Sequence, residues 1–149
     1  MTPLVYMAHP IGAATVEAVL LNIARAERWF RALCLAEPDV AFLASWLPYV
    51  KALDDTNQTH RARGIRDDHA IIERCRPNGI VLVGGRISVG MSAELEIVKR
   101  QRGWISDLTA CGAEPPPACF APAGSLLEMG RNEWLRRLAL ADAAAEIPC

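Results

Sequence analysis

A carboxylate stands at the start of a predicted helix, just beyond a predicted buried strand. The apolar run Gly79–Val83 is typical of a parallel strand, and Ser88 and Gly90 then predict a turn before a helix over residues 91–102. Glu94 therefore falls in the first helical turn past the carboxyl end of that strand, where open α/β sheets bind their ligands. Its charge could serve catalysis, or it could simply complement the helix dipole.

The turn before this helix offers a second kind of chemistry. Backbone amides around Ser88, Gly90 and Met91, together with the helix N-terminus, could form a cradle for an anion. Glycine is also the ordinary residue of a tight turn, so the same pattern fits a purely structural role.

Further polar side chains are expected at the same edge of the sheet. Tyr6 lies in a predicted strand over residues 4–8, and His9 and Pro10 follow at its carboxyl end. Because parallel strands end at one edge of a sheet, the Tyr6 hydroxyl could reach Glu94. The alternatives are a tyrosine packed in the core and a histidine in a solvated loop.

The segment 45–66 is predicted to be a long, irregular polar connection, of the kind that often forms a lid or binding loop. Trp46 within it could stack on a base or pack in the core. The segment also carries a basic cluster, Arg61, Arg63 and Arg66. Of these, Arg63 is the candidate for capturing a phosphate, and solvated charges are the alternative.

Asp68, or its neighbour Asp67, is expected to open a short helix that ends at Glu73. Aspartate is a common helix cap, which gives either residue a structural role. The other predicted elements are a helix over residues 15–34, strands over 40–44 and 104–108, and a helix over 126–147. This alternation predicts a single α/β domain over residues 1–149, with a parallel sheet, helices on both faces and a helical extension over 113–149.

Composition limits the classes of function. The net charge of -1 provides no overall cationic field for a nucleic acid polymer. No apolar stretch approaches the roughly 20 residues that a membrane-spanning helix needs. The five cysteines lack the spacing of a metal site, and with no export signal they suggest reduced thiols in a cytoplasmic protein.

Three motifs together resemble the nucleoside 2-deoxyribosyltransferase-like superfamily over about the first 105 residues. The segment 5–12, VYMAHPIG, is similar to that family's opening hydrophobic-Tyr-hydrophobic-Ala-Gly-Pro motif. Asp68, followed by Cys75 and the strand 79–83, is similar to its second motif. The segment Ser88–Glu94 is similar to its Ser/Asp-x-Gly-x-x-x-Glu motif. The chain also resembles the deoxynucleoside 5'-monophosphate N-glycosidases.

The resemblance implies a flavodoxin-like, Rossmann-like sheet of about five strands and cleavage of an N-glycosidic bond. Glu94 would attack the anomeric carbon of the sugar and form a covalent glycosyl-enzyme. Tyr6 would hydrogen-bond to Glu94 and orient it, and Asp68 would protonate the departing base. Ser88 and the Gly90 amide would hold a 5'-phosphate or 5'-hydroxyl. This chemistry needs neither a metal nor another cofactor.

One departure from the family pattern concerns the substrate pocket. His9 occupies the place of the family's usual glycine, so a side chain stands where the backbone normally approaches the substrate. It could contact a phosphate or narrow the pocket, and it keeps open the alternative of a non-catalytic module that senses a nucleotide or an NAD-like ligand. Hydrolysis and deoxyribosyl transfer cannot be separated by these residues.

Two expectations concern geometry and assembly. The Glu94 carboxylate should lie roughly 2.6–3.2 Å from the Tyr6 hydroxyl. The expected partners are a nucleoside or nucleotide substrate and further copies of the chain, as a homodimer or higher homo-oligomer. The resemblance implies that the extension over 113–149 could form the contact between copies. Neither a nucleic acid polymer nor a membrane is expected as a partner.

Overall fold

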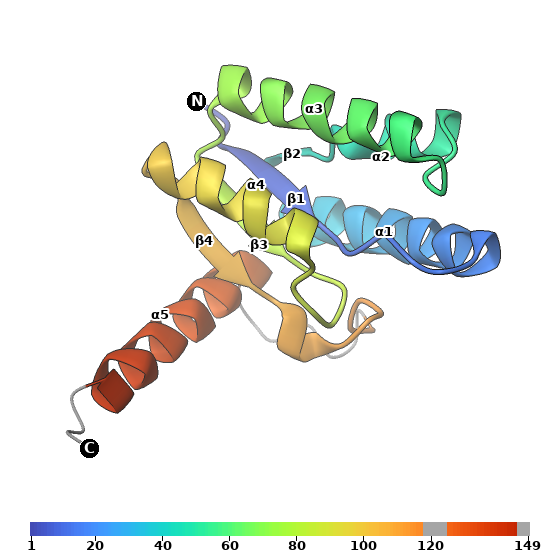
Figure 1. The fold of residues 1–149 in the computed structure, drawn as a ribbon. Coiled ribbons are helices and arrows are strands. Elements are labelled where there is room, and N and C mark those ends of the chain that lie inside the picture. The colour runs from blue at the N-terminus through green and yellow to red at the C-terminus, as the bar shows by residue number, and fades with distance from the viewer. Residues whose placement is uncertain (118–124, 146–149) are drawn as a thin grey trace.

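The fold is built on one sheet of parallel strands, seen in a computed structural model that describes residues 1–117 and 125–145 (Figure 1). The strands are β1 (Leu4–Ala8), β2 (Ala41–Leu43), β3 (Gly79–Leu82) and β4 (Trp104–Asp107). Their order in the sheet is β2-β1-β3-β4. This order equals the first four positions of the doubly wound order 2-1-3-4-5.

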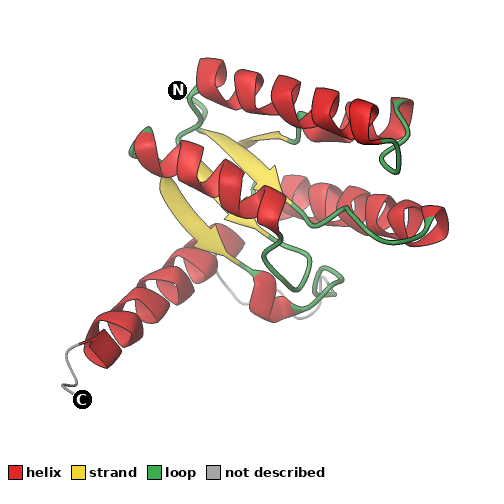
Figure 2. Ribbon diagram, viewed as in Figure 1, coloured by secondary structure: helices red, strands yellow, loops and turns green. Residues whose placement is uncertain are grey.

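Helices cover both faces of the sheet (Figure 2). They are α1 (Val16–Ala36), α2 (Trp46–Ala52), α3 (Gln58–Cys75), α4 (Val89–Arg100) and α5 (Leu126–Ala145), with a 3-10 turn at Thr109–Cys111. The helices α3 and α4 pack side by side on one face, and α1 and α5 lie on the other. The expected α/β class, parallel sheet and two-sided covering are confirmed. The described residues form four strands rather than about five, because the chain after β4 turns into α5.

The two central strands form the core. Val5, Tyr6, Met7 and Ala8 of β1 are fully buried, and so is the apolar segment 80–83 that includes the end of β3. Such continuous apolar runs are expected where a parallel strand has helices on both of its faces. The register pairs Tyr6 with Ile80 and Leu43, so the tyrosine side chain projects from the middle of the sheet.

The first helix forms where it was expected, over Val16–Ala36 where residues 15–34 were predicted. The Thr15 hydroxyl accepts a hydrogen bond from the backbone amide of Ala18, which caps α1. The buried residues of α1 recur every three or four positions: Val19, Ile23, Ala26, Trp29 and Leu33. A clear apolar stripe with a capping residue made this helix predictable.

The prediction of an irregular connection over residues 45–66 is wrong. Most of it is helical, in α2 and in the first half of α3. Asn57 caps α3 by accepting bonds from the amides of Thr59 and His60, so the helix begins at Gln58 and not at Asp67 or Asp68. Only Asp68 and Ile72 of α3 are buried, which leaves almost no apolar periodicity to read in the sequence.

The fourth helix begins two residues before its expected start. Ser88 caps α4 by accepting a hydrogen bond from the Met91 amide, so the helix begins at Val89. The expected helix over residues 126–147 is α5, whose described part ends at Ala145. None of the helices within 1–117 and 125–145 has the length and apolar character needed to cross a membrane.

The first part of α5 lies directly on β4, and its later turns extend away from the sheet (Figure 1). Leu126 and Leu127 are buried, and Glu37 accepts hydrogen bonds from Ser125 Oγ and the Leu127 amide. At Gly130 an added Cβ would come 2.2 Å from Ser106 Oγ and 2.9 Å from the Asp107 amide. A self-association contact through this region stays a prediction.

We predict that Gly130→Ala lowers the free energy of unfolding by about 1–3 kcal/mol, because the new methyl group meets backbone as well as side-chain atoms of β4. Helix propensity alone predicts the opposite sign, since alanine is favoured over glycine by about 1 kcal/mol. Urea denaturation measures the difference. Asn132→Ala, at an exposed position of the same helix, is the control and should change stability little. A stabilised Gly130→Ala would show that α5 does not pack on β4 in this way.

Candidate active site

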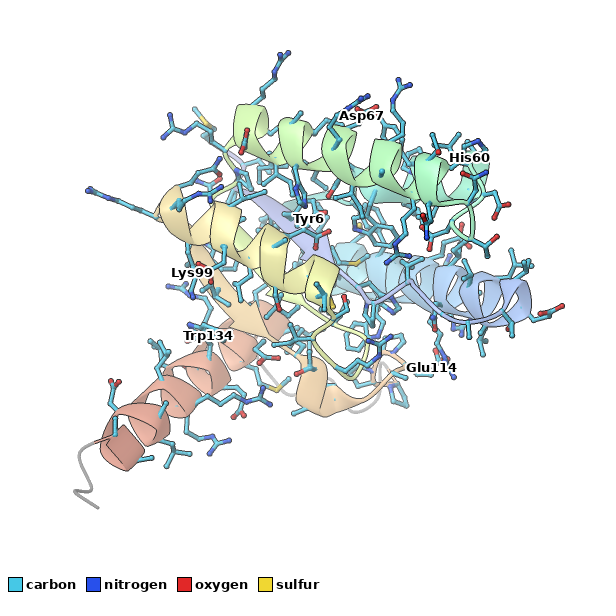
Figure 3. All side chains as sticks on the ribbon, in the orientation of Figure 1. Tyr6, His60, Asp67, Lys99, Glu114 and Trp134 are labelled. Carbon is cyan, nitrogen blue, oxygen red and sulfur yellow. The ribbon has the colours of Figure 1, made fainter. Side chains whose placement is uncertain are left out.

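Three acidic side chains from three elements meet beneath α3 and α4. Tyr6 comes from β1, Asp68 from the middle of α3 and Glu94 from the second turn of α4. The Tyr6 hydroxyl donates a hydrogen bond to Asp68 Oδ2 at 2.8 Å. Figure 3 shows Tyr6 between the ribbons of these two helices. Tyr6 and Asp68 are 62 residues apart in the sequence, and the fold brings them together because the crossover helix α3 packs on the parallel sheet that contains β1.

Ser45 completes the surroundings of Asp68. Its hydroxyl donates to Asp68 Oδ1 at 2.5 Å, so each oxygen of this carboxylate accepts one hydroxyl proton. Ser45 and Asp68 are 8% and 2% exposed, so these bonds are shielded from water. Ser45 lies two residues beyond the end of β2, at the same sheet edge as the other groups.

The surroundings of Glu94 differ from those of Asp68. Its Oε2 atom is enclosed and has no hydrogen-bond partner in the described part of the chain. The residue as a whole nevertheless keeps partial exposure, toward the hollows that it lines. Glu94 thus has one enclosed carboxylate oxygen next to the other acids and a side chain that borders open space.

The expected hydrogen-bonding reach between Tyr6 and Glu94 agrees with the raised pKa of Tyr6, to which burial and also a hydrogen bond with Glu94 contribute, and the expected distance stays a prediction. A phenol has one proton, and here Tyr6 gives it to Asp68. Glu94 still lies close enough for its charge to raise the pKa of Tyr6. The tyrosine therefore orients Asp68 directly and contacts Glu94 as a neighbour.

Burial governs the protonation of the three acids. Burial raises the pKa of Glu94 well above its ordinary value, and the charge of Asp68 raises it further. Burial also raises the pKa of Asp68, while the bonds from Ser45 and Tyr6 oppose that rise. The pKa of Tyr6 is raised well above its ordinary value by burial and by the two carboxylates. Two close carboxyl groups in such a place titrate as one coupled pair.

Glu94 borders a cleft with two arms. The first, called here the apolar arm, has a volume of about 360 Å³ and reaches between α2 and α3. Its walls are mainly apolar or aromatic: Trp46, Tyr49, Val50, Leu53 and Ile65. Asp68 and His69 also line it, so a flat ring in this arm would lie beside Asp68.

The second, called here the cationic arm, has a volume of about 440 Å³ and reaches the N-terminus of α4. It is lined by polar and charged groups that include His9, Arg61, Arg86, Ser88 and Gly90. Met91 also lines it and is otherwise packed in the core. Asp55, the ion-pair partner of Arg61, and Glu94 line it as well, so Arg86 and the helix N-terminus are the features that most favour an anion there.

Arg61, and not Arg63, belongs to this cleft. The Arg61 guanidinium pairs with Asp55 at 2.7 Å and lies against Gly12, where an added Cβ would come within 2.9 Å of both of its terminal nitrogens. Arg63 pairs instead with Asp67 at 2.6 Å and lines two other hollows. Figure 3 shows Asp67 on the outer side of α3, so the choice of Asp68 over Asp67 agrees with the geometry.

His9 is buried rather than solvated. It is 6% exposed, and its ring stacks on that of Trp46 with centroids 6.5 Å apart. Its Nδ1 donates to the Pro10 carbonyl at 2.8 Å, and burial lowers its pKa to about 4. Gly84, at a φ of 92°, allows the close approach, since an added Cβ there would come 2.6 Å from Pro10 and 2.8 Å from the histidine ring. Pro10 therefore supports His9 and does not itself line the cleft.

Sequence reasoning missed Ser45, His69 and Arg86 around the cleft, and within the basic cluster it chose Arg63 instead of Arg61 as the phosphate contact. On α3, Arg61, Asp68 and His69 are spaced so that they share the cleft side of the helix, a pattern that appears only once residues 58–75 are taken as helical. In the described ranges no group of three or more His, Cys, Asp or Glu is arranged to hold a metal ion.

The comparison with known proteins gives a family without an assigned activity. The sequence model of the family described as "Domain of unknown function (DUF7768)" matches residues 3–107, so the chain belongs to that family. The match spans the whole sheet and the residues of the cleft. No curated protein and no solved structure matches the chain.

We predict that Glu94→Gln changes how stability depends on pH. A carboxyl group whose folded pKa is raised contributes stability below its unfolded pKa, near 4.5, and this contribution is lost as the pH rises toward the folded pKa. The free energy of unfolding of Glu94→Gln minus that of the wild type should therefore increase as the pH rises from 4.5.

The difference between variants is needed because His9 acts in the opposite sense. Its pKa falls from 6.5 to about 4 on folding, so it adds stability as the pH rises through that interval in both proteins. Urea denaturation from pH 4.5 upward measures the difference. A difference that stays constant with pH would mean that Glu94 titrates normally and is not enclosed.

Proposed function

We propose that this member of the DUF7768 family cleaves the N-glycosidic bond of a nucleoside or a nucleoside 5'-monophosphate through a covalent intermediate on Glu94. The observation that carries the proposal is the position of Glu94, which lines both of the two unlike arms and lies beside a second buried carboxyl group. A nucleotide has the matching parts, a flat base and a charged phosphate on either side of a sugar.

The apolar arm supports binding of the base. Tyr49 offers aromatic surface, and Trp46 forms part of the wall, although it is 7% exposed and its indole N–H donates to the Met7 carbonyl at 3.0 Å. Asp68 and Glu94 line the same arm. A base in this arm would present a ring nitrogen to a carboxyl group that can deliver a proton. Protonation makes the base a better leaving group and lowers the barrier to breaking the bond between sugar and base.

Glu94 would capture the sugar. Loss of the base leaves positive charge on the anomeric carbon, and an ionised carboxylate stabilises that charge and then forms a bond to it, as in retaining glycosidases. Water or a second base would then release the sugar, giving hydrolysis or deoxyribosyl transfer. Glu94 must be ionised to attack the sugar, but burial favours its neutral form. Binding of the substrate must therefore cause Glu94 to lose its proton.

The cationic arm supports a 5'-phosphate. Arg86 and the N-terminus of α4 border this hollow, and Arg61 adds a guanidinium group that is paired with Asp55 and could exchange that partner for a phosphate. An uncharged 5'-hydroxyl would leave most of these groups unused. His9 is neutral at physiological pH, with its proton on Nδ1, so it adds no charge to this arm.

A binding module without catalysis is the second candidate. The observation that favours it is the raised pKa of Glu94, because a neutral carboxyl group is a poor nucleophile. In that case the same cleft would hold a nucleotide or an NAD-like ligand and release it unchanged.

Incubation with a panel of nucleosides and 5'-monophosphates should yield free base, measured by chromatography. Glu94→Gln should lower the rate by roughly a thousandfold or more, because it removes the nucleophile. Glu96→Gln is the matched control, since Glu96 lies on the same helix, is exposed and pairs with Lys99 at 2.8 Å. Thermal stabilisation by a ligand that remains intact would favour the binding module. Equal loss in both variants would mean that Glu94 has no special role.

The role of the cationic arm is tested by a pair of arginine variants. Arg61→Ala should raise KM for a monophosphate by about tenfold to a hundredfold, because a bond between charged groups in a cleft is lost. The same change should alter KM for the corresponding nucleoside far less. Arg63→Ala, on the same helix but outside the cleft, should leave both values nearly unchanged. An equal effect of the two variants would rule out Arg61 as the phosphate contact.

A further inference from the structure

The two carboxyl groups of the site are unequally supplied with hydrogen-bond donors. Asp68 accepts one hydroxyl proton on each oxygen, from Ser45 at 2.5 Å and from Tyr6 at 2.8 Å. Glu94 Oε2 is enclosed and accepts none within the described residues. Donors stabilise an anion, and an enclosed anion without a donor is costly. Negative charge is therefore favoured on Asp68 and disfavoured on Glu94.

The positive charge near the pair acts on Asp68. Tyr6 faces both carboxyl groups from β1, and the charge of His69 on α3 lowers the pKa of Asp68. Across the cleft, Arg61 is already paired with Asp55. Among the ion pairs of the described ranges none includes Asp68 or Glu94, so two charges side by side would have no ion-pair partner.

We propose that Asp68 and Glu94 share one proton, that this proton rests on Glu94 in the free protein, and that Ser45 is the positioning residue that keeps it there. A neutral Glu94 has a hydroxyl proton to donate, and the anionic Asp68 beside it is an acceptor. The consequence for catalysis rests on the proposed function, whereas the placement of the proton does not.

The shared proton would serve both halves of the reaction. When the base is bound, the proton passes from Glu94 to Asp68 and on to a ring nitrogen of the base. The bond between the base and the anomeric carbon breaks with its electron pair going to the base, and the Glu94 oxygen freed of its proton bonds to that carbon. Water then adds its hydroxyl to the carbon, the Glu94–sugar bond breaks with its electrons returning to the carboxylate, and the remaining proton of water restores the pair. The nucleophile is thus released only when a base is present to take the proton.

Infrared spectroscopy of the protein without substrate tests the placement of the proton. A neutral carboxyl group has a C=O stretching band above the amide bands, and carbon-13 in the side-chain carboxyl lowers its frequency. The chain is prepared with that label in glutamate only or in aspartate only, at neutral pH. We expect one such band that shifts with the glutamate label, is absent from Glu94→Gln and is retained in Glu96→Gln.

Variants of Ser45 test its role. Ser45→Ala removes a hydrogen bond to a charged group, which should shift the proton toward Asp68 by about tenfold or more, so that part of the band moves with the aspartate label. Ser45→Thr keeps the hydroxyl and should behave as the wild type. Absence of the band, or a wild-type band that shifts with the aspartate label, overturns the placement on Glu94. A Ser45→Ala spectrum equal to the wild type overturns the role of Ser45.

The infrared result and the assay for base release can fail separately. If the glutamate band is present but the protein releases no base, the proton rests on Glu94 as proposed and the proposed enzymatic function is wrong. Base release with no neutral carboxyl band would leave the enzyme intact and overturn the shared proton.

Discussion

The site depends on the hydrogen bond between the Tyr6 hydroxyl and Asp68, deep under α3 and α4. This bond joins the central strand to the long helix that crosses it, and with the bond from Ser45 it makes a buried carboxylate tolerable. Once Asp68 is satisfied in this way, Glu94 beside it is left without a donor for its enclosed oxygen. Asp68 accepts two hydrogen bonds and Glu94 Oε2 accepts none among the described residues, and this difference is the basis for assigning the two carboxyl groups different roles.

The scaffold brings these groups together through simple rules of parallel sheets. Side chains at the carboxyl ends of adjacent strands share one edge, and the helices that follow those strands start there. The α4 N-terminus and Glu94 therefore stand next to the groups carried by β1 and α3. Gly84 and Gly12 let His9 and Arg61 take their positions beside the cleft, because a Cβ at either glycine would meet those side chains.

Much of this arrangement was visible in the sequence. The strands over Leu4–Ala8 and Gly79–Leu82 were predictable because both faces are buried and the apolar run is continuous. Glu94 could be placed because a Ser-x-Gly turn locates the start of α4 within two residues. These are local signals, and each depends on only a few consecutive positions.

The other features of the fold and of the site depend on contacts between distant residues, which the sequence does not reveal. The apolar pattern of α3 is too sparse to predict the helix, because only Asp68 and Ile72 are buried, and without the helix Arg63 was chosen instead of Arg61. Ser45 carries no motif and becomes significant only through its distance to Asp68. The fifth strand was expected from the resemblance alone, and the described residues instead turn into α5, which uses Gly130 to lie on β4.

The most direct test of the account is to trap the intermediate. A 2'-fluoro nucleoside 5'-monophosphate slows release of the sugar from a carboxylate, so the protein would be incubated with it and measured by intact mass and peptide mapping. The account predicts one added fluorinated sugar phosphate per chain, attached to Glu94 and absent from Glu94→Gln. Release of base from natural nucleotides with no adduct on Glu94, or with an adduct on another residue, would contradict it.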